Sequence, residues 1–447
     1  MQRMVDRQTS QTSAESPGSR ADVSSSDSGG WRRWLFGLYL TFVGVYSIWI
    51  GAFMAREIDS WIIADWLINY SGGFVRRGFT GAVVMLLHRA TGFPLQWIVF
   101  AMEASVFVVF LASVYQLTRG IRWSYLMMAV LVSPATLAFT VLGGHEAGLR
   151  KEVLLFAALA ITICVLVWGR WKDWQVSALL SIFLVVLALS HEGLLVAVPY
   201  FFAAVAIQTK SLRRAVGICA VPFVLCGIAC AAVILHHGDR ATAETICSSV
   251  GGTLGTARAR AFHPLGGLCG GAIYWLQLDL AQGRELIAPA IQQWKLARLF
   301  EVIAIPTFAP VVALMVLFYR RDRLQYEVTV AAGCAFLSLA GMGVLFYVGI
   351  DWGRWLHIEV VSLMLLLLMM DRKANANPAQ TRPAKHYSLG NRVLATLALF
   401  LYATAWTLPG VGNEGETPGY LAVFWPLYRS DLHQLRLTIV QDVKKVV

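Results

Sequence analysis

The chain has 447 residues, of which 57% are hydrophobic and only 14% are charged. Soluble proteins contain about 25% charged residues, so this composition, with a mean hydropathy of +0.61, excludes an ordinary soluble domain. We expect an all-α, polytopic integral membrane protein in contact with membrane lipids. The net charge of +11 comes from short basic clusters between apolar segments, which is typical of orientation signals and does not indicate nucleic-acid binding.

Three regions can be separated along the chain. Residues 1–30 are rich in serine and nearly free of large apolar side chains, which predicts a disordered cytoplasmic tail. About eleven hydrophobic segments follow, and we expect residues 31–408 to form one transmembrane domain. Residues 409–447 are expected to form a short tail, on the outer side.

Basic clusters follow the second, fourth, sixth, eighth and tenth segments, which places these loops and the N-terminus in the cytoplasm of a bacterium, with the protein in its inner membrane. The stretch 176–208 leaves one alternative open, because its two segments have about 16 residues each, near the lower limit for crossing the hydrocarbon. If they form a re-entrant pair, the C-terminal tail changes side.

Two long segments are expected on the outer side, 56–96 and 236–296. The first ends in an amphipathic stretch up to Pro94 that is too short to cross the membrane, so we expect it to lie flat on the surface. The second contains Cys247 and Cys269. An oxidising compartment would allow these two to form a disulfide. Their spacing does not establish the geometry of a disulfide, so a disulfide and two free thiols are equally expected.

The string DWLINYSGGFVRRG places Asp65, Asn69 and Tyr70 before a glycine pair and the twin residues Arg76 and Arg77. Arginine grips phosphate bidentately and glycine permits close approach of the backbone, so this pattern is typical of a phosphate site beside a base. The alternative is that the two arginines only anchor a surface helix to lipid headgroups.

The string GGHEAGLRKE forms a second group, with His145, Glu146, Arg150 and Lys151 at the outer start of the fourth segment. Glu146 and Arg150 are four residues apart, so an ordinary ion pair along a helix explains part of the pattern. A histidine beside a carboxylate is also a usual arrangement for acid–base catalysis.

His191 and Glu192 lie between two short apolar segments, where charge is costly unless it lines a polar cavity. Together with His145 and Glu146 they could supply four ligands to a divalent metal if the loops converge. No spacing places these ligands on one helix face, so we expect no cofactor and no bound metal. A divalent ion is the alternative if the loops converge.

Asp351, Arg354 and His357 lie at the outer end of the tenth segment, and the first two are spaced to pair locally. Glu103 and Glu359 fall inside hydrophobic segments, where a carboxyl requires a partner, protonation or water. These two acids favour a rival interpretation as a transporter or flippase, in which they form a path with His191 and Glu192.

This pattern of segments and outer charges resembles the integral-membrane glycosyltransferases of the GT-C superfamily and, less specifically, bacterial envelope polysaccharide polymerases. In GT-C enzymes an acidic residue in the first outer loop faces a lipid-phosphate sugar donor, and Asp65, or alternatively Asp59, falls at that place. The chain departs from the superfamily in two respects: the two acids are six residues apart rather than paired, and the final tail is too small for a soluble outer domain.

The resemblance implies transfer of a sugar from a polyprenyl-phosphate-linked donor to a hydroxyl of an envelope glycan or lipid, without ATP. No Walker A or GxGxxG string occurs that would bind a nucleotide cofactor. Asp65 would be the general base. The implied catalytic set is Asp65, His145, Glu146, His191 and Glu192; the phosphate-binding set is Arg76, Arg77, Arg150, Lys151 and Arg354; further candidates are Asp59, Asn69, Tyr70, Asp351 and His357.

Overall fold

The computed structural model describes residues 30–56, 61–142, 150–252, 254, 269, 271–293, 296–320, 324–349, 351–375, 388–406 and 408. This part of the chain contains helices and no strands, which confirms the all-α prediction. In chain order the helices are α1 (Gly30–Arg56), α2 (Trp61–Leu67), α3 (Gly78–Thr91), α4 (Leu95–Leu117), α5 (Tyr125–Leu131), α6 (Phe139–Leu142), α7 (Glu152–Trp168), α8 (Asp173–Ser190), η2 (Glu192–Ala197), α9 (Val198–Thr209), α10 (Leu212–Leu235), α11 (Arg240–Ser249), η3 (Tyr274–Gln277), α12 (Leu280–Gln293), α13 (Leu296–Tyr319), α14 (Gln325–Val348), α15 (Trp352–Asn375) and α16 (Leu389–Thr404). The expected tails, 1–29 and 409–447, lie outside the described residues.

Seven helical segments of the described chain are long and apolar enough to cross a membrane: α1, α4, α8, η2 with α9, α10, α14 and α15. Three shorter apolar helices accompany them, namely α7, α16 and residues Ile303–Tyr319 of α13. The predicted count of eleven is therefore not confirmed. The stretch from α8 to α9 forms two helices that each qualify as a span, as the main topology requires.

The third predicted segment is broken into α5 and α6 by a turn at residues 132–138. A broken helix leaves backbone carbonyls unpaired, which is costly away from water. Here the buried hydroxyl of Thr136 lies 2.9–3.2 Å from the carbonyl oxygens of Val130, Leu131 and Ser133. The hydroxyl has one hydrogen to donate, so it compensates for part of the missing helical hydrogen bonding. The break coincides with Ser133 and Pro134, and a proline inside a helical pattern is a breaker.

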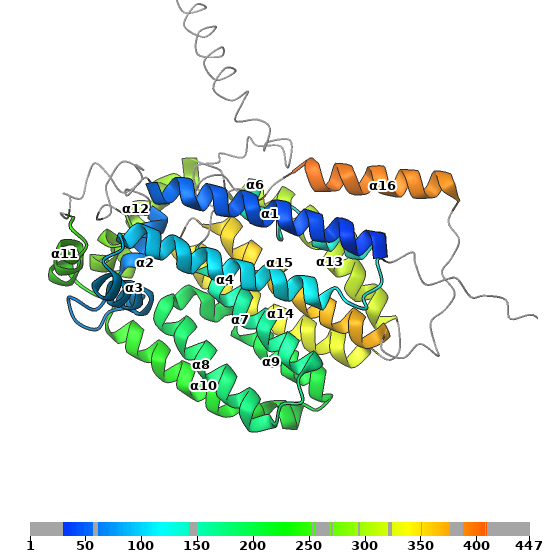
Figure 1. The fold of residues 1–447 in the computed structure, drawn as a ribbon, viewed down its shortest axis with the longest axis horizontal. Helices are drawn as coiled ribbons and strands as arrows, with labels where there is room; N and C mark the ends of the chain where they lie inside the picture. Colours follow the sequence, from blue (N-terminus) through cyan, green and yellow to red (C-terminus); the bar gives the residue numbers. More distant parts are fainter. Residues whose placement is uncertain are drawn as a thin grey trace, which may run out of the picture.

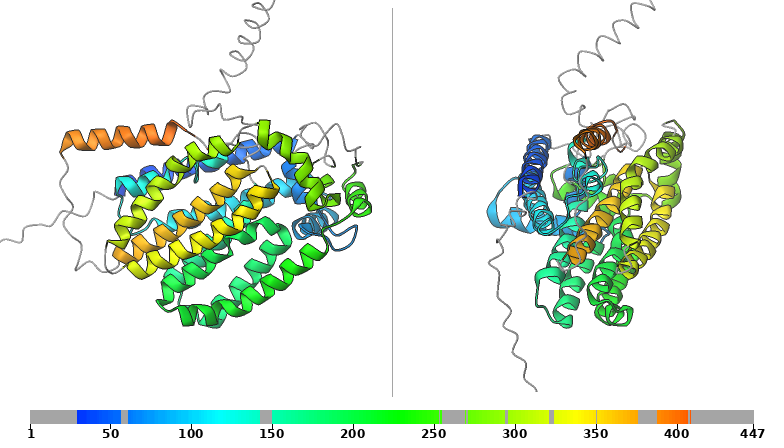
Figure 2. Two further views of the ribbon diagram at one scale, coloured as in Figure 1. Left: turned by 180° about the vertical axis from the view of Figure 1, so that it is seen from behind. Right: turned by 90° about the vertical axis from the view of Figure 1, so that its right-hand side faces the viewer.

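Helix α15 occupies the centre of the bundle, with α4, α7, α9, α13 and α14 packed against it (Figure 1). Every residue from Leu356 to Asp371 is buried, because the helix is apolar on all sides. By contrast, α16 lies at the periphery and exposes its leucines, as expected for a helix that faces lipid. Figure 2 shows α1 and α4 together on one flank of the same bundle.

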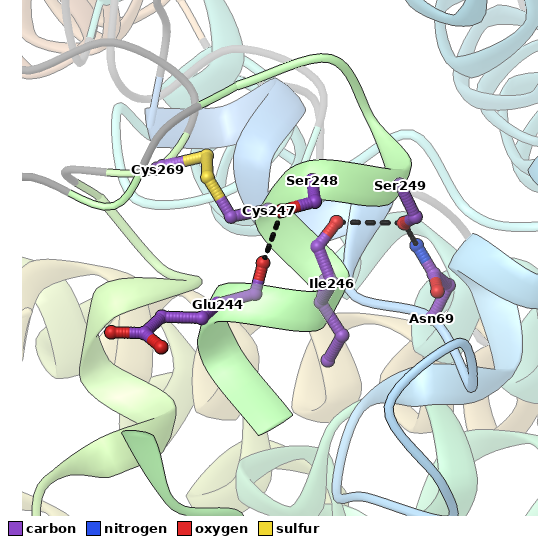
Figure 3. Close-up of a disulfide and its surroundings, with 7 residues drawn as sticks. All are labelled: Asn69, Glu244, Ile246, Cys247, Ser248, Ser249 and Cys269. Atoms are coloured by element: carbon purple, nitrogen blue, oxygen red, sulfur yellow. Dashed lines mark hydrogen bonds between the residues drawn. A yellow bond between two sulfur atoms is a disulfide. The ribbon is translucent and has the colours of Figure 1, made fainter. Parts of the chain in front are cut away.

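Helices α2, α3, α11 and α12 gather at one end of the bundle (Figure 1). At this end α1 and α8 terminate and α7 and α15 begin, and we name it the site end. The end of the bundle where α1 and α8 begin is named the opposite end. A disulfide between Cys247 and Cys269, with a Cα–Cα distance of 5.6 Å, closes α11 onto the following loop. In Figure 3 the Ser249 hydroxyl accepts a hydrogen bond from the Asn69 amide at 3.0 Å, which joins α11 to the loop after α2.

Candidate functional site

At the site end, one carboxylate lies between two positive charges. Asp65 on α2 has Oδ2 3.6 Å from Nζ of Lys151 and Oδ1 3.5 Å from Nη1 of Arg77. The Lys151 side chain is fully buried and the Asp65 side chain is 13% exposed. Because an unpaired buried charge is strongly destabilising, these three segments, α2 and the starts of α3 and α7, depend on one another.

The local chain conformation explains how Arg77 reaches this position. Trp66 and Leu67 are fully buried and anchor α2 beside the bundle. Arg77 immediately precedes α3 with a left-handed φ of 65°, which is rare for a residue other than glycine. A Cβ at Gly78 would lie 2.2 Å from the ring of Tyr70, so only glycine fits there. Strain of this kind persists where surrounding contacts hold it in place.

Arg77 also makes a bidentate ion pair with Glu192, the first residue of η2. Its Nε donates to both carboxylate oxygens at 3.0 Å, and its Nη2 donates to Oε1 at 2.7 Å. The backbone of His191 is extended between α8 and η2, so Glu192 projects from a break between two helices. The same break leaves the carbonyl of Ser190 free to accept a hydrogen bond from Lys151 Nζ at 3.0 Å.

Arg76 connects this cluster to distant loops. Its Nη2 donates to the carbonyl of Trp275 at 2.9 Å, its backbone N–H donates to the carbonyl of His236 at 3.0 Å, and its Nη1 lies 4.0 Å from Glu192. Its Nε is buried and has no hydrogen-bond partner among the described residues. The Arg76 side chain as a whole is 25% exposed, so an anionic ligand can approach the outer part of its guanidinium group.

A second ion network lies beside the first. Arg354 on α15 donates hydrogen bonds to Glu152, at the start of α7, and to Asp351. The Oε2 atom of Glu152 and the Nε atom of Arg354 are buried without a hydrogen-bond partner in the described chain. Both side chains line a small cavity of about 20 Å³, which has room for about one water molecule.

The walls of this cavity combine aromatic rings with charges. Its lining residues are Phe107, Phe110, Thr136, Leu137, Phe139, Thr140, Arg150, Glu152, Val153, Phe156, Arg354 and His357. The ring of His357 lies 4.5 Å from Phe139 and 5.0 Å from Phe156, and its Nδ1 is 2.9 Å from the carbonyl oxygen of Ala135. The cavity is therefore apolar with a few convergent polar groups, but as it stands it is smaller than a site for a sugar or a lipid.

Burial and neighbouring charges determine the protonation of the cluster. Burial disfavours the carboxylate of Asp65, but the charges of Lys151 and Arg77 outweigh it and lower its pKa to about 2. Burial lowers the pKa of Lys151 to about 8, against the opposing effect of Asp65. Burial, followed by the charge of Arg77, lowers the pKa of His191 to about 4. At neutral pH Asp65 is ionised and His191 is neutral.

His191 has a defined tautomer in this arrangement. Its Nδ1 accepts a hydrogen bond from the backbone N–H of Gly193 at 3.1 Å. We assign the proton of the neutral imidazole to Nε2 on this basis, because a nitrogen that accepts cannot also carry the proton. His191 is thus a hydrogen-bond donor, which suits a positioning role better than that of a base.

The structure separates the candidates of the sequence into those that converge and those that do not. Asn69 accepts from the Ser71 N–H at 2.8 Å and donates to the Leu67 carbonyl at 3.0 Å, so it shapes the loop after α2. Tyr70 stacks on Phe74, and His357 lies in the aromatic cavity. The convergent residues are Asp65, Arg76, Arg77, Lys151, His191 and Glu192, with Asp351 and Arg354 in the second network and Arg150 at the cavity. The candidates Asp59, His145 and Glu146 lie outside the described residues.

Two participants were not predicted from the sequence. Glu152, the partner of Arg354, follows Lys151 directly in GLRKE, and an acid in the first turn of a helix is a recognisable signal. The carbonyl of Trp275, which binds Arg76, has no signal in the sequence.

Lys151 was predicted to bind phosphate, whereas its Nζ is fully buried and already contacts Asp65 and the carbonyls of Ser190 and Arg77.

A metal site does not form in the part of the chain that the structure describes, where no three metal-ligating side chains come together. Of the four residues considered for a metal, His191 and Glu192 are described, and the carboxylate of Glu192 is held by Arg77. The remaining two, His145 and Glu146, lie outside the described residues.

Comparison with known proteins identifies a family but no activity. The family model described as "Uncharacterised membrane protein Rv1490" matches residues 34–259, half of the chain, from α1 to beyond α11. This range includes Asp65, Arg76, Arg77, Lys151, His191 and Glu192, which we name the Asp65 cluster, whereas Arg354 lies outside it. No curated protein and no solved structure matches the chain. The chain belongs to the family of uncharacterised membrane proteins Rv1490.

Proposed function

We propose that this protein is a membrane glycosyltransferase that moves a sugar from a polyprenyl-phosphate-linked donor to an envelope glycan or lipid at the outer face of the inner membrane. The observation that carries the proposal is the position of Asp65 between Lys151 and Arg77, at one end of the bundle and beside a second ion network that lines an aromatic cavity. A carboxylate beside arginines is the pair of groups that this reaction requires, a base and a partner for a leaving phosphate.

In the proposed reaction the acceptor oxygen forms a bond to the anomeric carbon of the sugar. The bond from that carbon to the phosphate oxygen breaks, and its electron pair leaves with the polyprenyl phosphate. The proton of the acceptor hydroxyl passes to Asp65. Arg76, which has an unpaired Nε, and Arg77 offset the negative charge of the phosphate as it leaves.

The charges also explain how Asp65 gains basicity only when a donor is bound. In the unliganded protein the pKa of Asp65 is lowered to about 2, chiefly because Lys151 and Arg77 outweigh the effect of burial, so the carboxylate is a weak base. A phosphate that binds Arg77 competes with Asp65 for the same positive charge. Its own negative charge then raises the pKa of Asp65 toward the operating pH.

Lys151 and His191 have supporting roles in this proposal. Lys151 is a positioning residue, since its buried Nζ holds Asp65 and makes no surface available to a ligand. His191 presents an Nε2–H donor that can orient an acceptor hydroxyl or a sugar oxygen. The cavity beside Arg354 has aromatic and cationic walls, and in this proposal it widens when the donor binds, because its present volume holds about one water molecule.

Two observations support an outward orientation of the site end. The disulfide of Cys247 and Cys269 lies there, and such bonds persist in oxidising compartments. Basic residues, including Lys172, Arg213 and Arg372, lie at the opposite end of the helices, as expected of the cytoplasmic side.

The decisive experiment is a mass-spectrometric profile of lipid-linked glycans in cells that lack the protein, restored with wild type, Asp65→Asn or Asp173→Asn. We expect an intermediate short of one sugar, or unpolymerised repeat units, in the deletion and in Asp65→Asn, because loss of a general base slows transfer by about 10²–10⁴-fold. Asp173→Asn is the matched control, since Asp173 pairs with Arg214 at the opposite end. An unchanged profile in the deletion, or full rescue by Asp65→Asn, would overturn the proposal.

A transporter is the second candidate, because a carboxyl lies in the middle of the bundle. Glu359 on α15 is fully buried and accepts hydrogen bonds from Tyr200 and from Ser338, the latter at 2.7 Å. Both oxygens of this carboxyl are satisfied, which equally suits a structural link between α9, α14 and α15. Transport would be favoured if Glu359→Gln, and not Asp65→Asn, reproduced the deletion.

A further inference from the structure

The basic side chains at the opposite end fall into two sets. In the first set, Arg214 pairs with Asp173, and Lys210 and Lys373 lie near Glu327. The second set, which we name the arginine cluster, has no ion-pair partner among the described residues and consists of Arg32 and Arg33 at the start of α1, Arg119 and Arg122 between α4 and α5, and Arg372 near the end of α15. The proposed transfer reaction uses none of these arginines.

One short loop brings the arginine cluster together. Nη1 of Arg32 donates a hydrogen bond to the carbonyl of Trp123 at 2.6 Å, and Nη1 of Arg372 donates to the carbonyl of Arg119. Trp123 and Arg119 are four residues apart in this loop, so their Cα atoms are separated by at most about 14 Å. Figure 1 shows the start of α1 and the ends of α4 and α15 on the same side of the bundle. The arginines therefore form one patch and not three separate orientation signals.

Exposed tryptophans give the depth of this patch in the membrane. Trp31 and Trp34 on α1 and Trp168 at the end of α7 are exposed, and exposed tryptophan is typical of the level of the lipid headgroups. The guanidinium group of Arg32 lies 5.4 Å from the ring of Trp31, and that of Arg372 lies 4.2 Å from the ring of Trp168. The arginine cluster thus lies at the depth of the lipid phosphates.

The contacts of these side chains leave hydrogen-bond donors unused. An arginine side chain has five N–H donors. Within the described part of the chain, the side chains of Arg32 and Arg372 each donate one hydrogen bond, and those of Arg119 and Arg122 donate none. Arg119 is exposed and Arg122 is half-buried, so a ligand can reach them. Arginine donors in this number match the oxygens of a phosphate group, which arginine binds bidentately.

The balance of charge favours an anion. One buried acid, Asp371, lies beside the cluster, and it accepts hydrogen bonds from the backbone N–H of Arg122 at 2.6 Å and from the amide of Asn375 at 3.0 Å. Asp371 thus holds the loop against α15, while five guanidinium groups face this one carboxylate. A cationic ligand would be repelled by such an excess of positive charge.

The surface beside the patch favours a lipid over a soluble anion. In the turns that follow the two arginines of α1, the side chains of Leu35, Leu38 and Phe42 are exposed and can be covered by acyl chains. We propose that the arginine cluster binds the phosphodiester headgroup of an anionic phospholipid in the leaflet at the opposite end. A zwitterionic phospholipid has the same phosphate, but its ammonium group adds positive charge where the protein already has an excess.

Native mass spectrometry of the full-length protein, exchanged into an equimolar mixture of phosphatidylglycerol and phosphatidylcholine with identical acyl chains, tests the ligand and the site. We expect the most tightly retained lipid to be phosphatidylglycerol. Arg119→Gln with Arg122→Gln should weaken its retention by about 30-fold, the combined contribution of two basic side chains at an anionic surface. Arg213→Gln with Arg320→Gln is the matched control, because it removes the same charge from exposed positions at the same end outside the cluster, and it should leave retention unchanged.

Three outcomes of this measurement would overturn the proposal. Equal retention of the two lipids would exclude an anionic headgroup as the ligand. Equal losses in the two double variants would show that only the total charge attracts the lipid. Displacement of the lipid by an excess of inorganic phosphate would assign the patch to a soluble anion.

Thermal unfolding in detergent provides a second measurement, because a ligand that binds only the folded state raises its Tm. Phosphatidylglycerol, and not phosphatidylcholine, should raise the Tm of the wild type and of the control variant, but not that of Arg119→Gln with Arg122→Gln. The same rise in all three proteins would overturn the site. Asp65→Asn should keep the full rise, since Asp65 lies at the other end of the bundle, so the result is independent of the proposed transfer reaction.

Discussion

The two ends of the bundle carry charged side chains in different ways. At the site end, Asp65 and Lys151 form an ion pair with side chains that are 13% and 0% exposed. At the opposite end, the side chains of Asp173 and Arg214 pair at 2.8 Å while 48% and 59% exposed. The exposed pair contributes little, whereas the buried pair must offset a large desolvation penalty. Burial of charge, rather than its amount, therefore distinguishes a candidate site from an orientation signal.

Among the described residues, the opposite end contains two buried carboxylates, Asp371 and Glu327, so burial alone does not define a candidate site. The backbone N–H of Arg122 donates a hydrogen bond to Asp371 at 2.6 Å. Glu327 is 1% exposed, and the amino groups of Lys210 and Lys373 lie 3.8 and 3.9 Å away. The Lys210 side chain is 62% exposed, so this cluster is open to solvent on one side. It ties the end of α9 and the start of α14 to the end of α15, and its residues do not line the cavity beside Arg354.

The largest effect on stability is expected from Glu192→Gln. This change keeps the shape of the side chain but removes the carboxylate that pairs with Arg77 and lies near Arg76. Breaking a buried ion pair costs about 3–5 kcal/mol, and we expect about 3 kcal/mol because both side chains are about one quarter exposed. Urea denaturation in detergent, followed by tryptophan fluorescence, measures the change. A loss below 1 kcal/mol would place Glu192 with the exposed pairs.

The sequence was sufficient to predict the class of fold and the distribution of charge. Hydropathy predicted a polytopic helical protein, which the structure and the family confirm. The basic clusters separated the two ends of the bundle, so Asp65, Arg77 and Glu192 could be placed on the same side. Their roles stay predictions, because the structure shows proximity and not chemistry.

The remaining features depend on information that a linear sequence does not carry. The break between α5 and α6 has a signal in Pro134, but the hydroxyl of Thr136 that helps to stabilise it has none. Asn69 and Tyr70 are further candidates because they are near Asp65 in the sequence; in the structure Asn69 shapes a loop and the ring of Tyr70 packs against Gly78. Spacing along the chain does not reveal which side of a turn a side chain occupies.

The disulfide offers a second test of the difference between the ends. Cys247 and Cys269 are separated by 22 residues, and closure of a loop of this length stabilises a protein by about 3 kcal/mol in the chain-entropy account. We expect Cys247→Ser with Cys269→Ser to destabilise by about 2 kcal/mol, because α11 can detach without unfolding the bundle. Hydrogen exchange should rise in α11 and stay unchanged in α8 and α10. A uniform increase in exchange would show that both ends unfold as one unit.

The dependence of the transfer rate on pH provides a third test, in which we expect the activation free energy to change by about 1.4 kcal/mol. Burial, opposed by Asp65, lowers the pKa of Lys151 to about 8, so Lys151 loses its charge above that pH. Neutral Lys151 makes Asp65 a stronger base but no longer holds it by an ion pair, and we expect the loss of positioning to outweigh the gain in basicity. The value of kcat/KM should then fall about tenfold by pH 9, and the fall should disappear in Lys151→Arg, which keeps its charge.

Stability should change in the opposite direction over the same range. The unfolded lysine keeps its proton up to about pH 10.4, so the unfolded state binds more protons than the folded state above pH 8 and folding stability rises with pH there. Parallel loss of stability and activity would therefore contradict the assignment to Lys151. Asp65 affects folding stability at acid pH instead. Its pKa is lowered to about 2, so its contribution to folding stability is lost only as the pH falls from about 4 to 2.

The smallest effect is expected at the opposite end, from Asp173→Asn. Asp173 accepts hydrogen bonds from Nε and Nη2 of Arg214 at 2.9 and 2.8 Å, a geometry as good as that of Arg77 and Glu192. If geometry determined the strength of an ion pair, both substitutions would be equally destabilising. Because the Arg214 pair is exposed and screened by salt, we expect a loss of less than about 1 kcal/mol, reduced further in 1 M salt, and an unchanged glycan profile. A loss near 3 kcal/mol would show that burial does not separate the two ends, and the argument that selects the Asp65 cluster as the site would lose its basis.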